Sequence, residues 1–205
     1  MDHLLNEEQF PAGFLPAWFE ARRRHALEQA EQLPEPSRHM ESWRFGAPGN
    51  ESLEHVEAAP PADPETLAPI IRERASMSEA LRIVYANGIP VSIPEELPEG
   101  LSVMDMEDFV LQCPDTARKY LETETETLGS EKLSALATAL QHNGLVIMAD
   151  RKISLPLEIL HFISGDNVAV FPSTLLIAET GSRLRILERH ISADHGRQFC
   201  GALQQ

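Results

Sequence analysis

Short apolar runs follow one another in the last part of the chain, with polar residues and turn formers between them. Each run is rich in valine, isoleucine and leucine and is bounded by Gly, Pro, Asp, Asn or Ser, which is typical of β-strands. The runs cover residues 145–148, 157–163, 168–171, 174–178 and 183–188. Their spacing is short and even, and no helical pattern lies between them. The pattern therefore predicts stacked β layers rather than strands joined by crossover helices.

The preceding sequence has mostly helical periodicity. Apolar residues at helical spacing predict a helix over residues 14–33, which Pro34 ends. Asp63 is a suitable N-cap and Pro64 fits the first helical position, so a second helix begins there. Further helices are predicted at residues 107–110, 115–127 and 130–142, the last with Ser130 as its N-cap and Gly144 as its C-terminal stop.

One hairpin interrupts this helical region. Asn87-Gly88 stands between the β-prone runs 81–85 and 89–93, and both turn residues accept positive φ angles. Residues 46–64 are rich in Pro, Gly, Ala and Glu and predict a linker or an irregular loop. The whole pattern predicts an α+β fold.

Composition narrows the class of protein. The chain has 205 residues, of which 42% are hydrophobic, so a packed core is expected. The formal net charge of −15 disfavours nucleic acid and anionic membrane surfaces as partners and favours either solubility or a basic protein partner. The two cysteines form no CxxC pair, and neither a signal peptide nor a membrane-length apolar run is found. A cytoplasmic protein is expected.

Common catalytic motifs are missing from the sequence, including GxxxxGK[ST], GxGxxG, HExxH and GxSxG. No catalytic, cofactor-binding or metal-ligating residue is therefore predicted, and no cofactor. The best candidate metal ligands are His161, His190, Asp194, His195 and Cys200. These residue types bind soft metals, but they lack the tight ligand pairs of most metal sites, which favours ordinary polar residues at a strand end and a turn.

Three polar residues in the strand-rich region also require an interpretation. Glu179 and Glu188 could act as paired carboxylates in acid–base chemistry, but an outer-face position is favoured. His161 interrupts an apolar strand, where a semi-buried, hydrogen-bonded histidine is expected.

Six motifs follow one another in order along nearly the whole chain. They are Met40–Phe45, Tyr85–Gly88 followed by Leu97–Leu101, the run Leu133–Met148, Leu155–Ile159, Phe171–Ile177 and Gly181–His190. Together they resemble the SufB/SufD family of iron–sulfur cluster assembly proteins, SufD in particular, and the first is similar to a Glu-x-Trp-Arg-aromatic signature near the start of the family. Gly46, Ala137, Ser173 and His190 depart from the residues common at their positions, as in a divergent member.

The resemblance implies an N-terminal helical region with a small hairpin, residues 1–129, followed at residues 130–205 by a capping helix and the first strands of a right-handed parallel β-helix. It implies a non-enzymatic component of an iron–sulfur cluster assembly (SUF-type) complex, with a SufB-like scaffold and a SufC-like ATPase as partners. The chain stops only a few strands into the expected β-helix, so its open end predicts pairing with another protein or with a second copy of the chain.

Two other functions remain open from the residues alone. The first is a small metal-dependent enzyme of cupin-like β fold that uses His161, His190, His195 and Glu188. The second is an acidic interaction module without any link to iron–sulfur chemistry.

Overall fold

A computed structural model of the chain describes residues 14–45, 53, 56–122 and 130–205. Within these ranges the helices are α1 (Ala17–Gln32), α2 (Pro64–Arg74), α3 (Met106–Gln112), α4 (Pro114–Leu121) and α5 (Glu131–Ala139), with short 3-10 turns at Glu41–Trp43 and Gln141–Asn143. The strands are β1 (Glu57–Ala58), β2 (Leu81–Ala86), β3 (Ile89–Ser92), β4 (Leu101–Asp105), β5 (Leu145–Ala149), β6 (Leu157–Ile163), β7 (Val168–Val170), β8 (Ser173–Ala178), β9 (Ile186–Ser192), β10 (Gln198–Cys200) and β11 (Leu203–Gln204).

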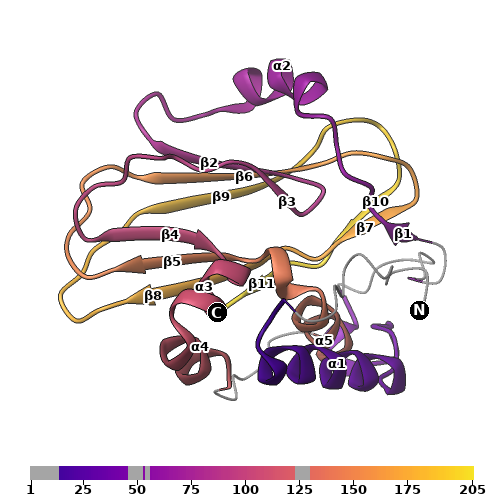
Figure 1. Cartoon of the computed structure of the whole chain (residues 1–205). Helices are drawn as coiled ribbons and strands as arrows, with labels where there is room; N and C mark the ends of the chain where they lie inside the picture. The colour runs from indigo at the N-terminus through magenta and orange to yellow at the C-terminus, as the bar shows by residue number, and fades with distance from the viewer. Residues whose placement is uncertain (1–13, 46–52, 54–55, 123–129) are drawn as a thin grey trace.

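The described strands form three sheets, with the orders β3-β2-β6-β9, β11-β8-β5-β4 and β1-β7-β10. In Figure 1 the first sheet lies above the second, and the short third sheet is beside them; α2 lies over the first sheet, while α1, α3, α4 and α5 lie below the second. Consecutive strands from β5 to β11 have no helix between them and fall into different sheets in turn. The predicted stacked β layers without crossover helices are therefore confirmed.

The prediction of a right-handed parallel β-helix is wrong. Two of the three sheets are mixed, because β3 pairs antiparallel with β2 and β4 pairs antiparallel with β5. Strands from the expected helical region are thus built into the same sheets as the later strands. The physical reason is the Asn87-Gly88 hairpin, which reverses the chain beside β2, and the unforeseen pairing of β4 with a strand more than forty residues away in sequence.

Local sequence signals are mostly confirmed. The first helix occupies Ala17–Gln32 within the predicted range. Asp63 caps α2 by accepting a hydrogen bond from the Glu65 backbone N–H, and Pro64 is its first residue. The Ser130 side chain accepts a hydrogen bond from the Leu133 backbone N–H at the start of α5. Such caps satisfy N–H groups that a helix leaves free, so a few adjacent residues determine them.

Two elements have bounds that differ from the predictions. The helix expected to reach residue 142 ends at Ala139, and Gly144 has an extended backbone instead of a left-handed one. The strand predicted at 183–188 is β9, three residues later, because β9 aligns with β6 from the Leu157–Ile186 pair onward. Residues 123–127 of the predicted fourth helix, and most of residues 46–55 of the predicted loop, lie outside the described residues.

The apolar core lies between the first two sheets and under the helices. Ile83, Leu145, Ile147, Leu157 and Ile159 fill the space between the sheets. A second cluster attaches α1, α3 and α4 to the outer face of the β8-β5-β4 sheet, and a third holds α2 on the β2-β6 face. The predicted division at residues 129/130 falls beside residues 123–129, outside the described ranges, and stays a prediction.

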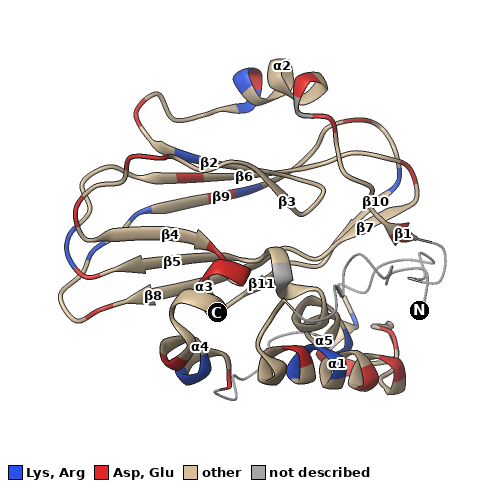
Figure 2. Cartoon of the chain, in the orientation of Figure 1, with Lys and Arg blue, Asp and Glu red and all other residues tan. Residues whose placement is uncertain are grey.

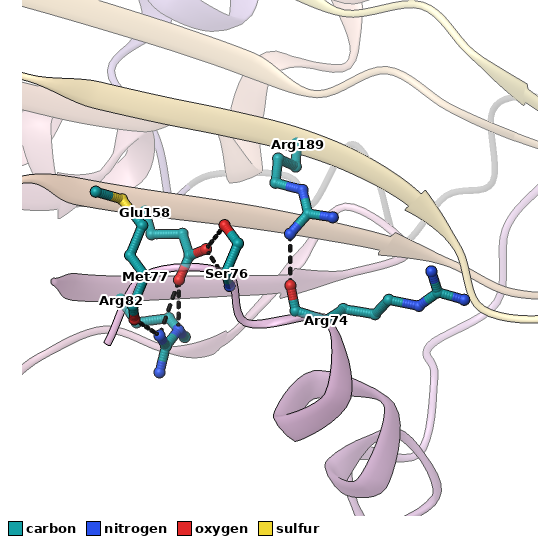
Figure 3. A network of polar contacts seen from close by, with 6 residues as sticks. All are labelled: Arg74, Ser76, Met77, Arg82, Glu158 and Arg189. Carbon is teal, nitrogen blue, oxygen red and sulfur yellow. Dashed lines mark hydrogen bonds and ion pairs between the residues drawn. The ribbon is translucent and has the colours of Figure 1, made fainter. Parts of the chain in front are cut away.

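A buried carboxylate connects α2 to the first sheet (Figure 3). Glu158 of β6 is fully buried. Its Oε1 accepts hydrogen bonds from the Ser76 backbone N–H at 2.8 Å and the Ser76 hydroxyl at 2.7 Å. Its Oε2 accepts a hydrogen bond from Arg82 Nε at 2.9 Å and lies 2.8 Å from Arg82 Nη2. Nearby, Arg189 of β9 donates a hydrogen bond to the carbonyl oxygen of Arg74, so the segment after α2 is held at two points.

Charged residues gather on the helices and loops rather than on the inner strands (Figure 2). Helix α1 carries both acidic and basic residues, whereas β5 and β7 carry neither kind. Within the described ranges, none of the helices combines the length and the apolar character that a membrane span requires.

Replacing Asn87 by glycine is expected to lower the free energy of unfolding by about 1–2 kcal/mol. Asn87 has a φ of 50°, which glycine adopts freely, so the turn itself should persist. The change removes bonds from the Asn87 amide to the Pro60 carbonyl at 2.7 Å and from the Ser164 N–H at 2.9 Å. Urea unfolding followed by circular dichroism measures the difference.

The matched control is Asn167→Gly, because Asn167 also has a positive φ, of 57°, but its side chain bonds only to exposed Asp166 among the contacts found. We expect the control to change stability by less than about 0.5 kcal/mol. Equal losses in the two variants would mean that the side-chain bonds of Asn87 contribute nothing.

Candidate functional site

Three aromatic side chains lie in a column across the first sheet. The parallel register aligns Tyr85 of β2 with His161 of β6, and His161 with His190 of β9. Residues at equal positions of neighbouring strands point to the same face, so their rings meet. The ring centroids of Tyr85 and His161 are 5.1 Å apart, and those of His161 and His190 are 4.8 Å apart with planes only 11° from parallel.

Glu188 lies beside this column and touches both histidines. It precedes His190 by two residues in β9 and so shares its face. Its Oε1 is 3.1 Å from His161 Nε2 and 3.6 Å from His190 Nε2, and its Oε2 accepts a 2.8 Å hydrogen bond from Gln204 Nε2. Burial opposes the charged form, but His161, His190 and Gln204 outweigh it, so the pKa of Glu188 lies below its usual value. Glu188 is therefore a carboxylate at neutral pH.

Cys200 of β10 completes the cluster from the short third sheet. Its Sγ is 3.5 Å from His190 Nδ1, on the side of the ring opposite Glu188. Cys200 as a residue is exposed, yet partial burial of the thiol and the charge of Glu188 raise its pKa to about 11. Burial and the neighbouring His161 lower the pKa of His190, against the opposing effect of Glu188. Neutral thiol and neutral imidazole thus face one another at neutral pH.

His161 differs from its prediction. The residue is only 3% exposed, so it is buried rather than semi-buried. Its Nε2 lies 3.1 Å from Glu188 Oε1, whereas its Nδ1 is buried without a hydrogen-bond partner. The predicted polar partner is therefore present for one ring nitrogen only. Buried polar atoms without a partner are uncommon in proteins and mark this position as unusual.

A small cavity of about 60 Å³ adjoins the column. Tyr85, Asn87, His161 and Ser173 contribute its polar lining. The Tyr85 hydroxyl is buried without a hydrogen-bond partner, like His161 Nδ1. Burial raises the pKa of Tyr85, so its hydroxyl stays protonated and can donate. The cavity can hold water-sized polar molecules that would satisfy these groups.

The sequence-derived candidates divide into two groups. His161, Glu188, His190 and Cys200 come together, whereas His195 is exposed in the turn after β9. Asp194 stabilises that turn, because its carboxylate accepts hydrogen bonds from the backbone N–H groups of Gly165 and Gly196. No three His, Cys, Asp or Glu side chains of the described residues are arranged to hold a metal ion. The metal-dependent cupin-like enzyme is therefore unsupported there.

Glu188 is the site residue whose position sequence reasoning missed. It was expected on the outer face, but Ile186 packs into the core and Glu188 and His190 follow on the same inward face. Leu187, between them, is 39% exposed. Alternation counted from a strand beginning at Ile186 would have located it. Glu179 lies apart from Glu188, exposed at the end of β8, so no carboxylate pair forms.

Comparison with known proteins relates the chain to an iron–sulfur cluster assembly protein. No protein-family model matches the chain. The chain is 25% identical over 187 residues to the iron–sulfur cluster assembly protein SufD of Bacillus subtilis (strain 168). The aligned region covers 86% of this chain but 42% of SufD, so the chain spans less than half the length of that relative. The match indicates a distant SufB/SufD-like relationship.

Proposed function

We propose that the chain is a non-catalytic component of iron–sulfur cluster assembly and acts through contacts with other proteins. The observation that carries this proposal is the match to SufD over 86% of the chain. The aligned region extends over most of the chain and is not limited to a single motif, which favours a shared function. The proposed partners are a SufB-like scaffold and a SufC-like ATPase.

The edges of the three sheets support contacts with another polypeptide. Among the described strands, β9, β10 and β11 each pair on one side only. Arg185 O and Ala193 N bond to β6, so the alternation of a parallel ladder turns the backbone groups of Glu188 and His190 toward the free edge of β9. Unpaired N–H and C=O groups of this kind readily accept a further strand.

Co-expression with the SufB-like scaffold and the SufC-like ATPase of the same genome tests the partner part of the proposal. We expect the three proteins to elute together from a size-exclusion column, with a mass by light scattering that fits one complex. The chain analysed alone tests the predicted homo-oligomer. Separate elution under all conditions would contradict the proposed partners.

Deletion of the coding sequence tests the assembly role itself. The activities of iron–sulfur enzymes should fall in the deleted strain under iron limitation, and the chain expressed from a plasmid should restore them. Enzymes without such clusters serve as the control. Unchanged iron–sulfur enzyme activities would contradict the assembly role, whatever the partners.

A further inference from the structure

We propose that Cys200 and His190 form an open, two-ligand site for a thiophilic divalent metal ion such as Zn²⁺, with Glu188 positioning His190. The proposal concerns these residues only and does not depend on the assembly role. A two-ligand site needs other ligands from solvent or from a bound molecule, which agrees with the missing three-ligand group among the described residues.

The spacing of the two ligand atoms fits one metal ion. Zinc binds thiolate sulfur at about 2.3 Å and imidazole nitrogen at about 2.0–2.1 Å with tetrahedral angles. These lengths place the sulfur and nitrogen of one zinc ion about 3.6 Å apart. Cys200 Sγ and His190 Nδ1 are 3.5 Å apart. An ion can therefore join them with little movement of β9 or β10.

The surroundings of His190 resemble those of metal-bound histidines. Such histidines usually direct their other ring nitrogen at a carboxylate, which fixes the ring and increases its basicity. His190 Nε2 faces Glu188 Oε1 at 3.6 Å, and Gln204 holds the second oxygen of that carboxylate. Two strands, β9 and β11, thus orient the ring so that Nδ1 points at Cys200.

His161 adds a buried polar group beside the two ligands. Its ring is 3% exposed, stacks on His190 and directs Nε2 at Glu188 Oε1 at 3.1 Å, while its Nδ1 has no hydrogen-bond partner. Leaving a buried group unsatisfied costs stability. The ring of His190 is therefore held between the ring of His161 on one side and the Cys200 thiol at its Nδ1.

The solvent exposure of Cys200 and His190 determines how readily a bound ion exchanges. Cys200 is exposed and the His190 side chain is 29% exposed, so the remaining metal positions face solvent. Closed structural zinc sites have four protein ligands, and catalytic sites have three. A site with two should exchange its ion readily. On binding, the S–H bond is replaced by a sulfur–metal bond and the thiol proton leaves to solvent.

Cobalt titration of the reduced, metal-free chain tests the proposal. We expect one equivalent of Co²⁺ to produce a thiolate-to-cobalt charge-transfer absorption, which Zn²⁺ then removes by displacement. Cys200→Ser should abolish the absorption. Cys113→Ser is the matched control, because Cys113 is the other cysteine of the chain and lies at the end of α3, and it should leave the absorption unchanged.

The positioning role of Glu188 has its own readout. Glu188→Gln should weaken Co²⁺ affinity about 10-fold while the charge-transfer absorption at saturation persists. His190→Gln should weaken affinity further and change the visible cobalt bands, because an imidazole ligand is lost. An affinity unchanged in both variants would overturn the assignment of His190 and Glu188.

Alkylation of the wild-type chain tests the proposal even if the variants fail to fold. Zn²⁺ should slow alkylation of Cys200 by iodoacetamide, as read by peptide mass spectrometry, and leave alkylation of Cys113 unchanged. Equal rates with and without millimolar Zn²⁺ would overturn the proposal. So would a wild-type chain that gives no thiolate absorption with Co²⁺, or an absorption that survives Cys200→Ser.

Discussion

Replacing Phe19 by alanine should lower the free energy of unfolding by about 3–5 kcal/mol, the range found for buried phenylalanines. Phe19 of α1 is fully buried in a cluster with Phe109 of α3 and with Val146 and Leu175 of two neighbouring strands. The change removes most of a side chain from the contact that holds the first helix on the sheet. Guanidinium unfolding, followed by circular dichroism, measures the loss.

The matched control is Phe14→Ala. Phe14 lies three residues before α1 and is 79% exposed, so its loss should change stability by less than about 0.5 kcal/mol. A small loss for Phe19→Ala, or similar losses for both variants, would mean that α1 is not packed on the β8-β5 face. The same unfolding curves test the predicted division at residues 129/130, which would give two transitions.

Features set by neighbouring residues could be predicted from sequence. Asp63-Pro64, Asn87-Gly88 and Ser130 each act within one turn of chain, so the α2 cap, the hairpin and the α5 cap were all found. The apolar runs that became β5 and β6 were found for a similar reason, because burial on both faces requires continuous apolar sequence.

Features set by distant partners could not be predicted. The run Leu101-Ser102-Val103-Met104 alternates apolar and polar residues, but nothing in it shows that its partner is β5 or that the pairing is antiparallel. The short strands β10 and β11 have no apolar pattern of their own and exist because β7 and β8 offer parallel partners. The antiparallel pairing of β4 with β5 is one of the two pairings that make two of the three sheets mixed.

The candidate site shows the same limit. Sequence spacing suggested His190, His195 and Cys200 as a group, but the turn at Asp194 sends His195 outward. His161 and Glu188 enter the cluster because the β6–β9 register aligns His161 with His190. Residues so far apart in the chain meet only through that register, and a one-residue slip would move them to opposite faces.

Replacing Glu158 by glutamine should lower the free energy of unfolding by about 2–3 kcal/mol at neutral pH, the range for hydrogen bonds to charged groups. The glutamine would keep the length of the side chain but present an NH₂ group to donors. The Ser76 backbone N–H at Oε1 and the Arg82 guanidinium at Oε2 can only donate, so the glutamine NH₂ group faces a donor in either orientation. Urea unfolding gives the difference, and exposed Glu96→Gln is the matched control that should show almost none.

The same substitution should change the response to acid. Burial opposes the charge on Glu158, but Ser76 and Arg82 outweigh it, so its pKa in the folded protein lies below the usual value. A depressed folded pKa adds stability above the unfolded pKa, and that stability is lost as the pH falls through the folded pKa. The gap between wild type and Glu158→Gln should therefore be largest at neutral pH and shrink in acid. Repeating the urea curves about one pH unit below the ordinary glutamate pKa measures this, and a gap of constant size would show that the Glu158 charge adds nothing.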